Sequence, residues 1–148
     1  MNIENIKNTK GKILGVDFGD VRTGLAISDP SRMLALCCET VRAEGIENIT
    51  RVVGDYAKAQ GVGAVIVGLP VNMDGSEGHR AERAKRFAAM LSEYTGLPVE
   101  TIDERMTTMQ ASRYLNATDT RGKKRKNAID TLSAQIILQS ALDRMTNL

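Results

Sequence analysis

The chain has 148 residues, the usual size of one compact domain, and a hydrophobic fraction of 42%, which is enough for an ordinary core. Its 20 basic and 18 acidic residues give a net charge of +2. Aromatic residues make up only 3%, which argues against an RNA-binding surface built on stacked rings. The two cysteines are adjacent, so the sequence has no disulfide framework or zinc motif and indicates a reducing compartment.

The first ten residues are polar, so we expect residues 1–10 to form a flexible N-terminal leader without a signal peptide. A single domain is expected over residues 11–148. It opens with apolar segments separated by turn residues, a pattern typical of strands. The three strands expected there follow one another along the chain, at 12–18, 23–29 and 33–42.

Helices and strands alternate over the rest of the chain. Apolar residues at helical spacing predict helices, and a continuous apolar run predicts a strand covered on both faces. The expected elements are helix 46–59, strand 64–69, helix 82–94, strand 99–102, short helix 108–115 and last helix 127–145. This βββαβαβαα order indicates an α/β fold with a mixed five-stranded sheet flanked by helices. No apolar run is long enough to predict a membrane span.

Asp17 is the most informative residue, because a carboxylate is unusual within a predicted core strand. Strand alternation puts it on the same face as Ile13 and Gly15, and the small glycines beside it leave room for a ligand. A buried carboxylate is costly unless it is paired or bound to a metal. The alternative is an Asp at a strand end that begins a turn into Gly19.

Two further acidic positions favour a metal site. Asp103 and Glu104 stand at the carboxyl end of a predicted strand, where ligands of α/β sheets gather, and only one of two adjacent residues would face the site. Asp130 lies in the first turn of the last helix, on one stripe with Ala134. The alternatives are a solvated strand end paired with Arg105, and a carboxylate that stabilises a helix start.

Carboxylates from two strands and one helix in a single pocket would raise one another's pKa, and divalent cations would relieve that conflict. Mg²⁺ suits carboxylate and water oxygens. Two such ions about 3.5–4 Å apart can activate a water and stabilise the leaving oxygen in phosphodiester cleavage. We therefore expect catalytic carboxylates and Mg²⁺ or Mn²⁺, as two ions.

A basic loop and a polar loop suggest nucleic-acid contacts. Residues 121–126 hold five positive charges and stand just before the helix of Asp130, so they could neutralise backbone phosphates. Asn72, in the glycine-rich loop 68–78, could contact sugar or phosphate. His79 fits an ordinary surface residue better than a general base, and a solvated loop is the alternative for 121–126. The expected nucleic-acid contacts are Arg22, Asn72, Arg105, Arg121, Lys123, Lys124, Arg125 and Lys126.

Four stretches together resemble the YqgF family, also called RuvX: residues 15–29, 67–75, 103–108 and 129–130. The resemblance implies an RNase H-like fold and a metal-dependent nuclease that matures the 5′ end of pre-16S ribosomal RNA in the bacterial cytoplasm. Asp17 matches the metal ligand of the first strand and Asp130 the carboxylate of the last helix. Glu104 is favoured over Asp103 as the second ligand. Arg22 matches the family's hairpin arginine, which would hold phosphate.

Structured RNA is therefore the expected substrate of a cytoplasmic, Mg²⁺- or Mn²⁺-dependent endonuclease that acts as a monomer or weak homodimer. A dimeric resolvase of branched, four-way DNA junctions is one alternative. A non-catalytic RNA-binding factor of ribosome assembly is another. A sugar kinase or actin-like ATPase is a third, since Asp17-Phe18-Gly19 resembles a phosphate loop, although those folds need two such domains.

Overall fold

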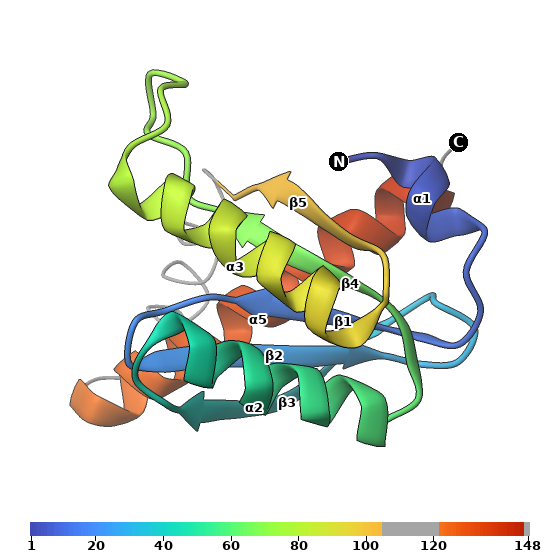
Figure 1. The fold of residues 1–148 in the computed structure, drawn as a ribbon, viewed down its shortest axis with the longest axis horizontal. Coiled ribbons are helices and arrows are strands. Elements are labelled where there is room, and N and C mark those ends of the chain that lie inside the picture. Colours follow the sequence, from blue (N-terminus) through green and yellow to red (C-terminus); the bar gives the residue numbers. More distant parts are fainter. Residues whose placement is uncertain (105–121, 147–148) are drawn as a thin grey trace.

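The computed structural model describes the backbone of residues 1–104 and 122–146, and the side chains of 1–36, 39–104 and 132–146. Figure 1 shows the elements as a ribbon whose colours follow the sequence. Their bounds are α1 Ile3–Lys7, β1 Lys12–Asp17, β2 Arg22–Ser28, β3 Ala35–Arg42, α2 Ile46–Ala59, β4 Val62–Leu69, α3 His79–Thr95, β5 Val99–Asp103 and α5 Gly122–Thr146.

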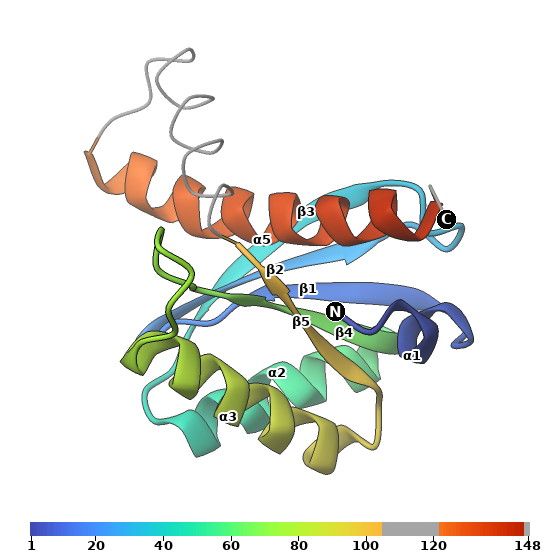
Figure 2. The ribbon, with the colours of Figure 1, turned by 90° about the horizontal axis from the view of Figure 1, so that it is seen from above.

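The five strands form one mixed sheet in the order β3-β2-β1-β4-β5. β1 pairs antiparallel with β2, and β2 with β3, whereas β4 runs parallel to both β1 and β5. Figure 2 shows α2 and α3 on one face of this sheet and α5 on the other. The predicted α/β class, with a mixed five-stranded sheet between helices, is therefore confirmed.

Strand alternation divides the core between the two faces of the sheet. Leu14 and Val16 of β1 pack with Phe87 of α3, while Ile13 packs with Ile137 and other residues of α5. β4 contributes to both cores, which explains its continuous apolar sequence. The α5 face is the one that carries the candidate site, as described below.

The N-terminal segment differs from the flexible leader that the sequence predicts. Residues Ile3–Lys7 form α1, and Ile6 is fully buried in the core on the α5 side. The backbone N–H of Asn2 donates to Glu100 Oε1 at 2.7 Å, and Arg32 Nη1 donates to the Ile6 carbonyl at 3.1 Å. Ile3 and Ile6 are three residues apart, which fits one turn of a helix, but two apolar residues are too few for a sequence pattern to predict this packing.

The last helix also differs from the prediction, because α5 begins at Gly122 rather than near residue 127. Residues 122–126 are thus the first turns of a helix and not a loop, in keeping with the good helix propensity of Lys and Arg. Arg121 and the short helix expected at 108–115 lie outside the described residues. Within the described part of the chain, no helix is long and apolar enough to cross a membrane.

Candidate active site

Three parallel strands bring the predicted acidic residues to one end of the sheet. Asp17 is the last residue of β1, Asp103 is the last residue of β5, and Glu104 follows it directly. β4 lies between these two strands and ends there as well. The carboxyl ends of parallel strands form the usual ligand-binding end of an α/β sheet.

Asp17 faces α5, as strand alternation predicts. Gly15 sits directly beneath that helix, because a Cβ atom at Gly15 would stand 2.6 Å from Leu138 Cβ and 3.0 Å from the Ala134 carbonyl oxygen. Asp17 lies two residues further along β1 and so points to the same side of the sheet. It is half-buried, at the position where β1 leaves the core.

The Glu104 carboxylate lies above Gly68 on the same face of the sheet. A Cβ atom at Gly68 would overlap Glu104 Oε2 and would stand 2.5 Å from Ile137 Cδ1 of α5. The backbone N–H of Glu104 donates to the Leu69 carbonyl at 3.1 Å, which holds this residue against the end of β4. Glu104 is therefore packed between β4 and α5.

Asp17 and Glu104 approach Gly68 from neighbouring strands. Val16 pairs with Val67 in the register of β1 and β4, so the next step along both strands sets Asp17 beside Gly68. Adjacent strands lie about 4.8 Å apart. The absence of a side chain at Gly68 thus leaves room for two carboxylates on the α5 face.

Asp103 has a different environment from its neighbour. It pairs with Leu69 in the β4–β5 register and is exposed. Strand alternation turns it away from Ile102, which is buried on the α5 side. Of the two adjacent acids, the structure thus brings Glu104, and not Asp103, to the face of Asp17.

The electrostatic environment of Glu104 disfavours its charged form. Burial raises the pKa of the Glu104 carboxyl to about 7, the positive charge of Arg80 opposes this shift, and the negative charge of Asp103 adds to it. A buried carboxylate is costly to ionise, and Arg80 offsets that cost only in part, because the pKa stays raised. A bound cation would supply further positive charge.

The third expected acid, Asp130, belongs to α5 by its backbone, but its side chain lies outside the described residues. Helix α5 runs antiparallel to β1: Ala134 lies over Gly15, and Gln139 bonds to the backbone of Ala35 at the opposite end of the sheet. Residue 130, one turn before Ala134, is therefore on the Asp17 side. Among the described side chains, no group of three His, Cys, Asp or Glu residues could hold a metal.

The expected nucleic-acid contacts are placed only in part. Arg22 begins β2 and lies at the same end of the sheet as Asp17, because Asp17 pairs with Gly24. Asn72 is exposed, and its side chain donates to Ser76 Oγ at 3.0 Å. Arg105 and Arg121 lie outside the described residues. The backbones of four others fall in the first turns of α5: Lys123, Lys124, Arg125 and Lys126.

Sequence reasoning missed a hollow beside Glu104 that includes two residues at the start of α3. The hollow has a volume of about 290 Å³. We call it the Arg80 hollow, and its lining residues are Pro70, Val71, Asn72, Gly78, His79, Arg80 and Glu104. The available signal was the position of Arg80, just after the loop that leaves the carboxyl end of β4.

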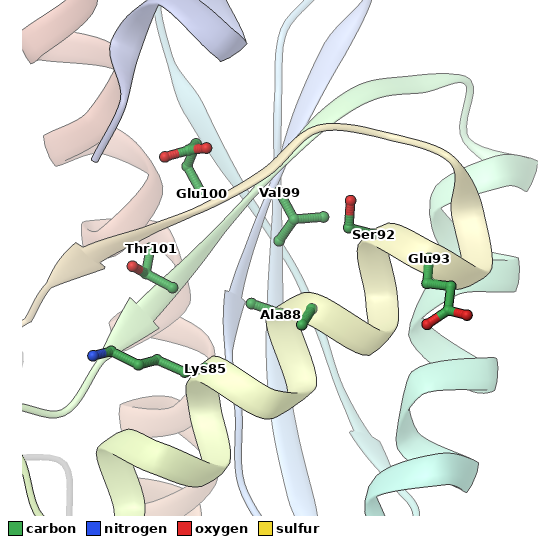
Figure 3. A pocket seen from close by; sticks show the side chains of 8 residues that line it. Lys85, Ala88, Ser92, Glu93, Val99, Glu100 and Thr101 are labelled. Carbon is green, nitrogen blue, oxygen red and sulfur yellow. The ribbon is translucent and has the colours of Figure 1, made fainter.

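A second hollow, of about 570 Å³, lies between α3 and β5, and Figure 3 shows the side chains around it. Val99 and Thr101 of β5 line it. Ile102 faces α5, so strand alternation puts Val99 and Thr101 on the α3 side of the sheet. The carboxylate of Glu100 is bound on the α1 side by the Asn5 side chain, at 2.9 Å. The sheet therefore separates this hollow from Asp17 and Glu104.

The chain is similar to known proteins over most of its length. A family model described as "RuvX: Holliday junction resolvase" matches residues 11–144. A protein of Pelotomaculum thermopropionicum named "Putative pre-16S rRNA nuclease" is 43% identical over 137 residues, which cover 89% of this chain and 86% of that protein. A protein of the same name from Caldanaerobacter subterraneus is 42% identical, with 92% of this chain and 99% of that protein covered.

Two solved structures share the fold at low sequence identity. The Thermus thermophilus RuvC structure in complex with a Holliday junction substrate has a TM-score of 0.56 at 16% identity, covering 91% of this chain and 96% of that chain. The Fowlpox virus resolvase in complex with Holliday junction DNA has a TM-score of 0.51 at 14% identity, covering 92% and 97%. These likenesses identify the RuvC-like, RNase H-like architecture of the chain.

Proposed function

The chain belongs to the RuvX family, and on that premise we propose that it is a metal-dependent endonuclease that acts in the 5′-end processing of pre-16S ribosomal RNA in the cytoplasm. The observation that carries this proposal is the position of the Glu104 carboxylate over Gly68, on the same face as Asp17. Nuclease-family relatives at about 40% identity support hydrolysis of nucleic acid.

Asp17, Glu104 and Asp130 are the proposed metal ligands. Their carboxylate oxygens are the donors that Mg²⁺ and Mn²⁺ prefer, and the disfavoured charge of Glu104 fits a ligand that becomes ionised against a cation. Two bound ions would supply an activated water and stabilisation of the leaving oxygen. The chain contributes fixed carboxylates and the space above Gly68.

Basic residues near the acids would hold the substrate. Arg22 lies at the same end of the sheet as Asp17, and the first turns of α5 carry Lys123, Lys124 and Arg125 just before residue 130. Contacts from such residues to backbone phosphates position a nucleic acid without reading its sequence. Structured RNA is thus the proposed substrate. A monomer or weak homodimer remains our prediction for the oligomeric state.

Cleavage of a precursor ribosomal RNA fragment by the purified protein tests the proposal. We expect cleavage with Mg²⁺ or Mn²⁺, none with EDTA, and a loss of at least about 100-fold in Asp17→Asn and Glu104→Gln, as metal-site removal requires. Asp143→Asn is the matched control, because Asp143 is an exposed acid at the far end of α5 that accepts a bond from Gln139. Wild-type cleavage by Asp17→Asn would refute its proposed role.

A four-way DNA junction is the second candidate substrate, because the matching family model is described as a Holliday junction resolvase. A resolvase would make symmetric paired nicks in a junction and would act as a dimer. RNA and junction DNA should be compared at equal salt, since salt dominates the affinity of phosphate contacts. Binding of RNA with no cleavage in any metal would instead favour a non-catalytic assembly factor.

A further inference from the structure

We propose that the Arg80 hollow is a subsite for a backbone phosphate that adjoins the cleaved bond, and that Arg80 is the residue that binds it. The inference rests on the proposed nuclease function and adds a substrate-positioning group to it. Its basis is a preformed hollow lined by both Glu104 and Arg80, in which the exposed Arg80 side chain has no ion pair among the described residues.

The position of the hollow ties it to the candidate active site. Glu104 lines it, together with Asn72 and His79. Because Glu104 lines the hollow, a group bound there would lie next to the Glu104 carboxylate, which stands above Gly68 on the same face as Asp17. Successive phosphates of a nucleic-acid strand are close enough that one in the Arg80 hollow would adjoin another at the two acids. The volume of about 290 Å³ is large enough to admit a phosphate group.

Arg80 differs from its two basic neighbours on α3 because, among the described residues, no acidic side chain holds it in an ion pair. Arg83, one turn later, is held by Asp20, with Nη2 and Oδ1 2.7 Å apart, and Lys85 forms an ion pair with Glu77. Within the described part of the chain, no hydrogen bond or ion pair holds Arg80, which is exposed and acts on the Glu104 carboxyl through its positive charge. Its planar guanidinium group can donate two parallel hydrogen bonds to one phosphate.

The loop that contributes Asn72 to the hollow is held in place by its own hydrogen bonds. The Ser76 hydroxyl and backbone N–H both donate to Asp74 Oδ1, at 2.6 and 2.9 Å. The backbone N–H of Asn72 donates to the Ser76 carbonyl at 2.9 Å. Because this loop is already ordered, binding does not require the entropy loss of ordering it, which favours the affinity for a ligand.

Binding of a precursor ribosomal RNA fragment in EDTA tests Arg80 apart from any metal. We expect Arg80→Ala to bind about tenfold or more weakly at low salt, because it loses a charge-assisted contact, and its log–log salt slope to fall by about 0.7 for a single strand. Arg80→Lys should keep the slope and recover part of the affinity. Arg86→Ala should match wild type, since Arg86 is exposed on the same helix and lines neither of the hollows described above.

A second arm locates the phosphate. Each linkage near the cleavage point is replaced in turn by an uncharged methylphosphonate at a 2′-deoxy position, in the RNA and in a DNA strand of the same sequence. At one linkage next to the cleavage point, this replacement should weaken binding to the wild-type protein and leave binding to Arg80→Ala unchanged. A linkage that weakens both proteins equally, or equal binding by Arg80→Ala and Arg86→Ala, would overturn the subsite.

The two proposals fail in different ways. If Arg80→Ala binds more weakly than wild type in EDTA, with the smaller salt slope, but wild type does not cut with Mg²⁺ or Mn²⁺, the nuclease would be refuted and phosphate binding by Arg80 supported. Wild-type protein that cuts while Arg80→Ala binds like Arg86→Ala would support the nuclease and refute the subsite. A protein that binds neither strand would refute the subsite directly.

Discussion

The carboxylate of Glu104 occupies the space that a side chain at position 68 would need. A Cβ atom at Gly68 would overlap Glu104 Oε2 and would stand 2.5 Å from Ile137 Cδ1. Gly68 has no positive φ, so its role is to leave room and not to allow an unusual backbone conformation. The position of the Glu104 carboxylate thus depends on the absence of one methyl group on the neighbouring strand.

Gly68→Ala should therefore weaken metal binding more than it weakens folding. The new methyl group meets the flexible ends of two side chains, which can move aside, so we expect a destabilisation of about 1 kcal/mol. Displacement of Glu104 should reduce Mn²⁺ affinity by about 10- to 100-fold, the usual effect of disturbing a residue that orients a ligand. Calorimetric Mn²⁺ titration and thermal unfolding measure the two effects, and unchanged Mn²⁺ affinity in Gly68→Ala would contradict this account.

Gly15→Ala should show the opposite balance. A Cβ atom there would stand 2.6 Å from Leu138 Cβ and 3.0 Å from the Ala134 carbonyl oxygen, both of which are fixed parts of α5. The helix must shift as a body, so we expect a loss of about 1–3 kcal/mol in the free energy of unfolding. Urea unfolding of the two variants compares them, and equal stability of Gly15→Ala and wild type would mean that α5 adjusts freely.

Sequence patterns were sufficient for the parts of the site that depend on strand alternation. The alternation of Ile13, Gly15 and Asp17 predicted the face of the first acid. The same rule left Asp103 and Glu104 as alternatives, because the face of Ile102 is known only from the structure, and Glu104 was favoured on the family resemblance. The continuous apolar run of β4 likewise predicted burial on both faces. These features follow from local geometry, so the sequence contains the information.

Features that arise from tertiary packing were not predictable in the same way. Ile6 is buried because α1 folds back against the α5 side of the core, which no local pattern indicates. The Arg80 hollow exists because the loop after β4 and the start of α3 meet Glu104, and these segments are separate in the sequence. The sequence predicted a loop at residues 122–126 because of their dense charge. They form the start of α5 instead, in keeping with the good helix propensity of Lys and Arg.

Glu104→Gln should stabilise the metal-free protein at high pH. In the folded chain the pKa of Glu104 is raised from 4.5 to about 7, chiefly by burial, so the folded state binds the proton more tightly than the unfolded state. Its favourable contribution is complete below pH 4.5 and is lost as the pH rises through 7. Thermal unfolding in EDTA should show this loss in wild type and not in Glu104→Gln. Parallel pH profiles of the two proteins would contradict the assignment.

Asp29→Ala should lower stability at neutral pH and have little effect in strong acid. Asp29 Oδ1 accepts bonds from the N–H groups of Met33 and Leu34, at 2.8 and 2.9 Å, and Oδ2 accepts one from the Ser31 hydroxyl. The Leu34 bond is the main cause that lowers the pKa of Asp29 from 3.8 to about 2.

Because the folded pKa of Asp29 is the lower one, the stabilisation is present above pH 3.8 and disappears as the pH falls through about 2. The difference in melting temperature between wild type and Asp29→Ala should therefore shrink over that interval. Asp143→Ala serves as the control, since Asp143 is an exposed acid that accepts a bond from the Gln139 side chain on its own helix and caps no turn. A wild-type advantage over Asp29→Ala that stays constant down to pH 2 would show that the carboxylate's charge does not stabilise the turn after β2.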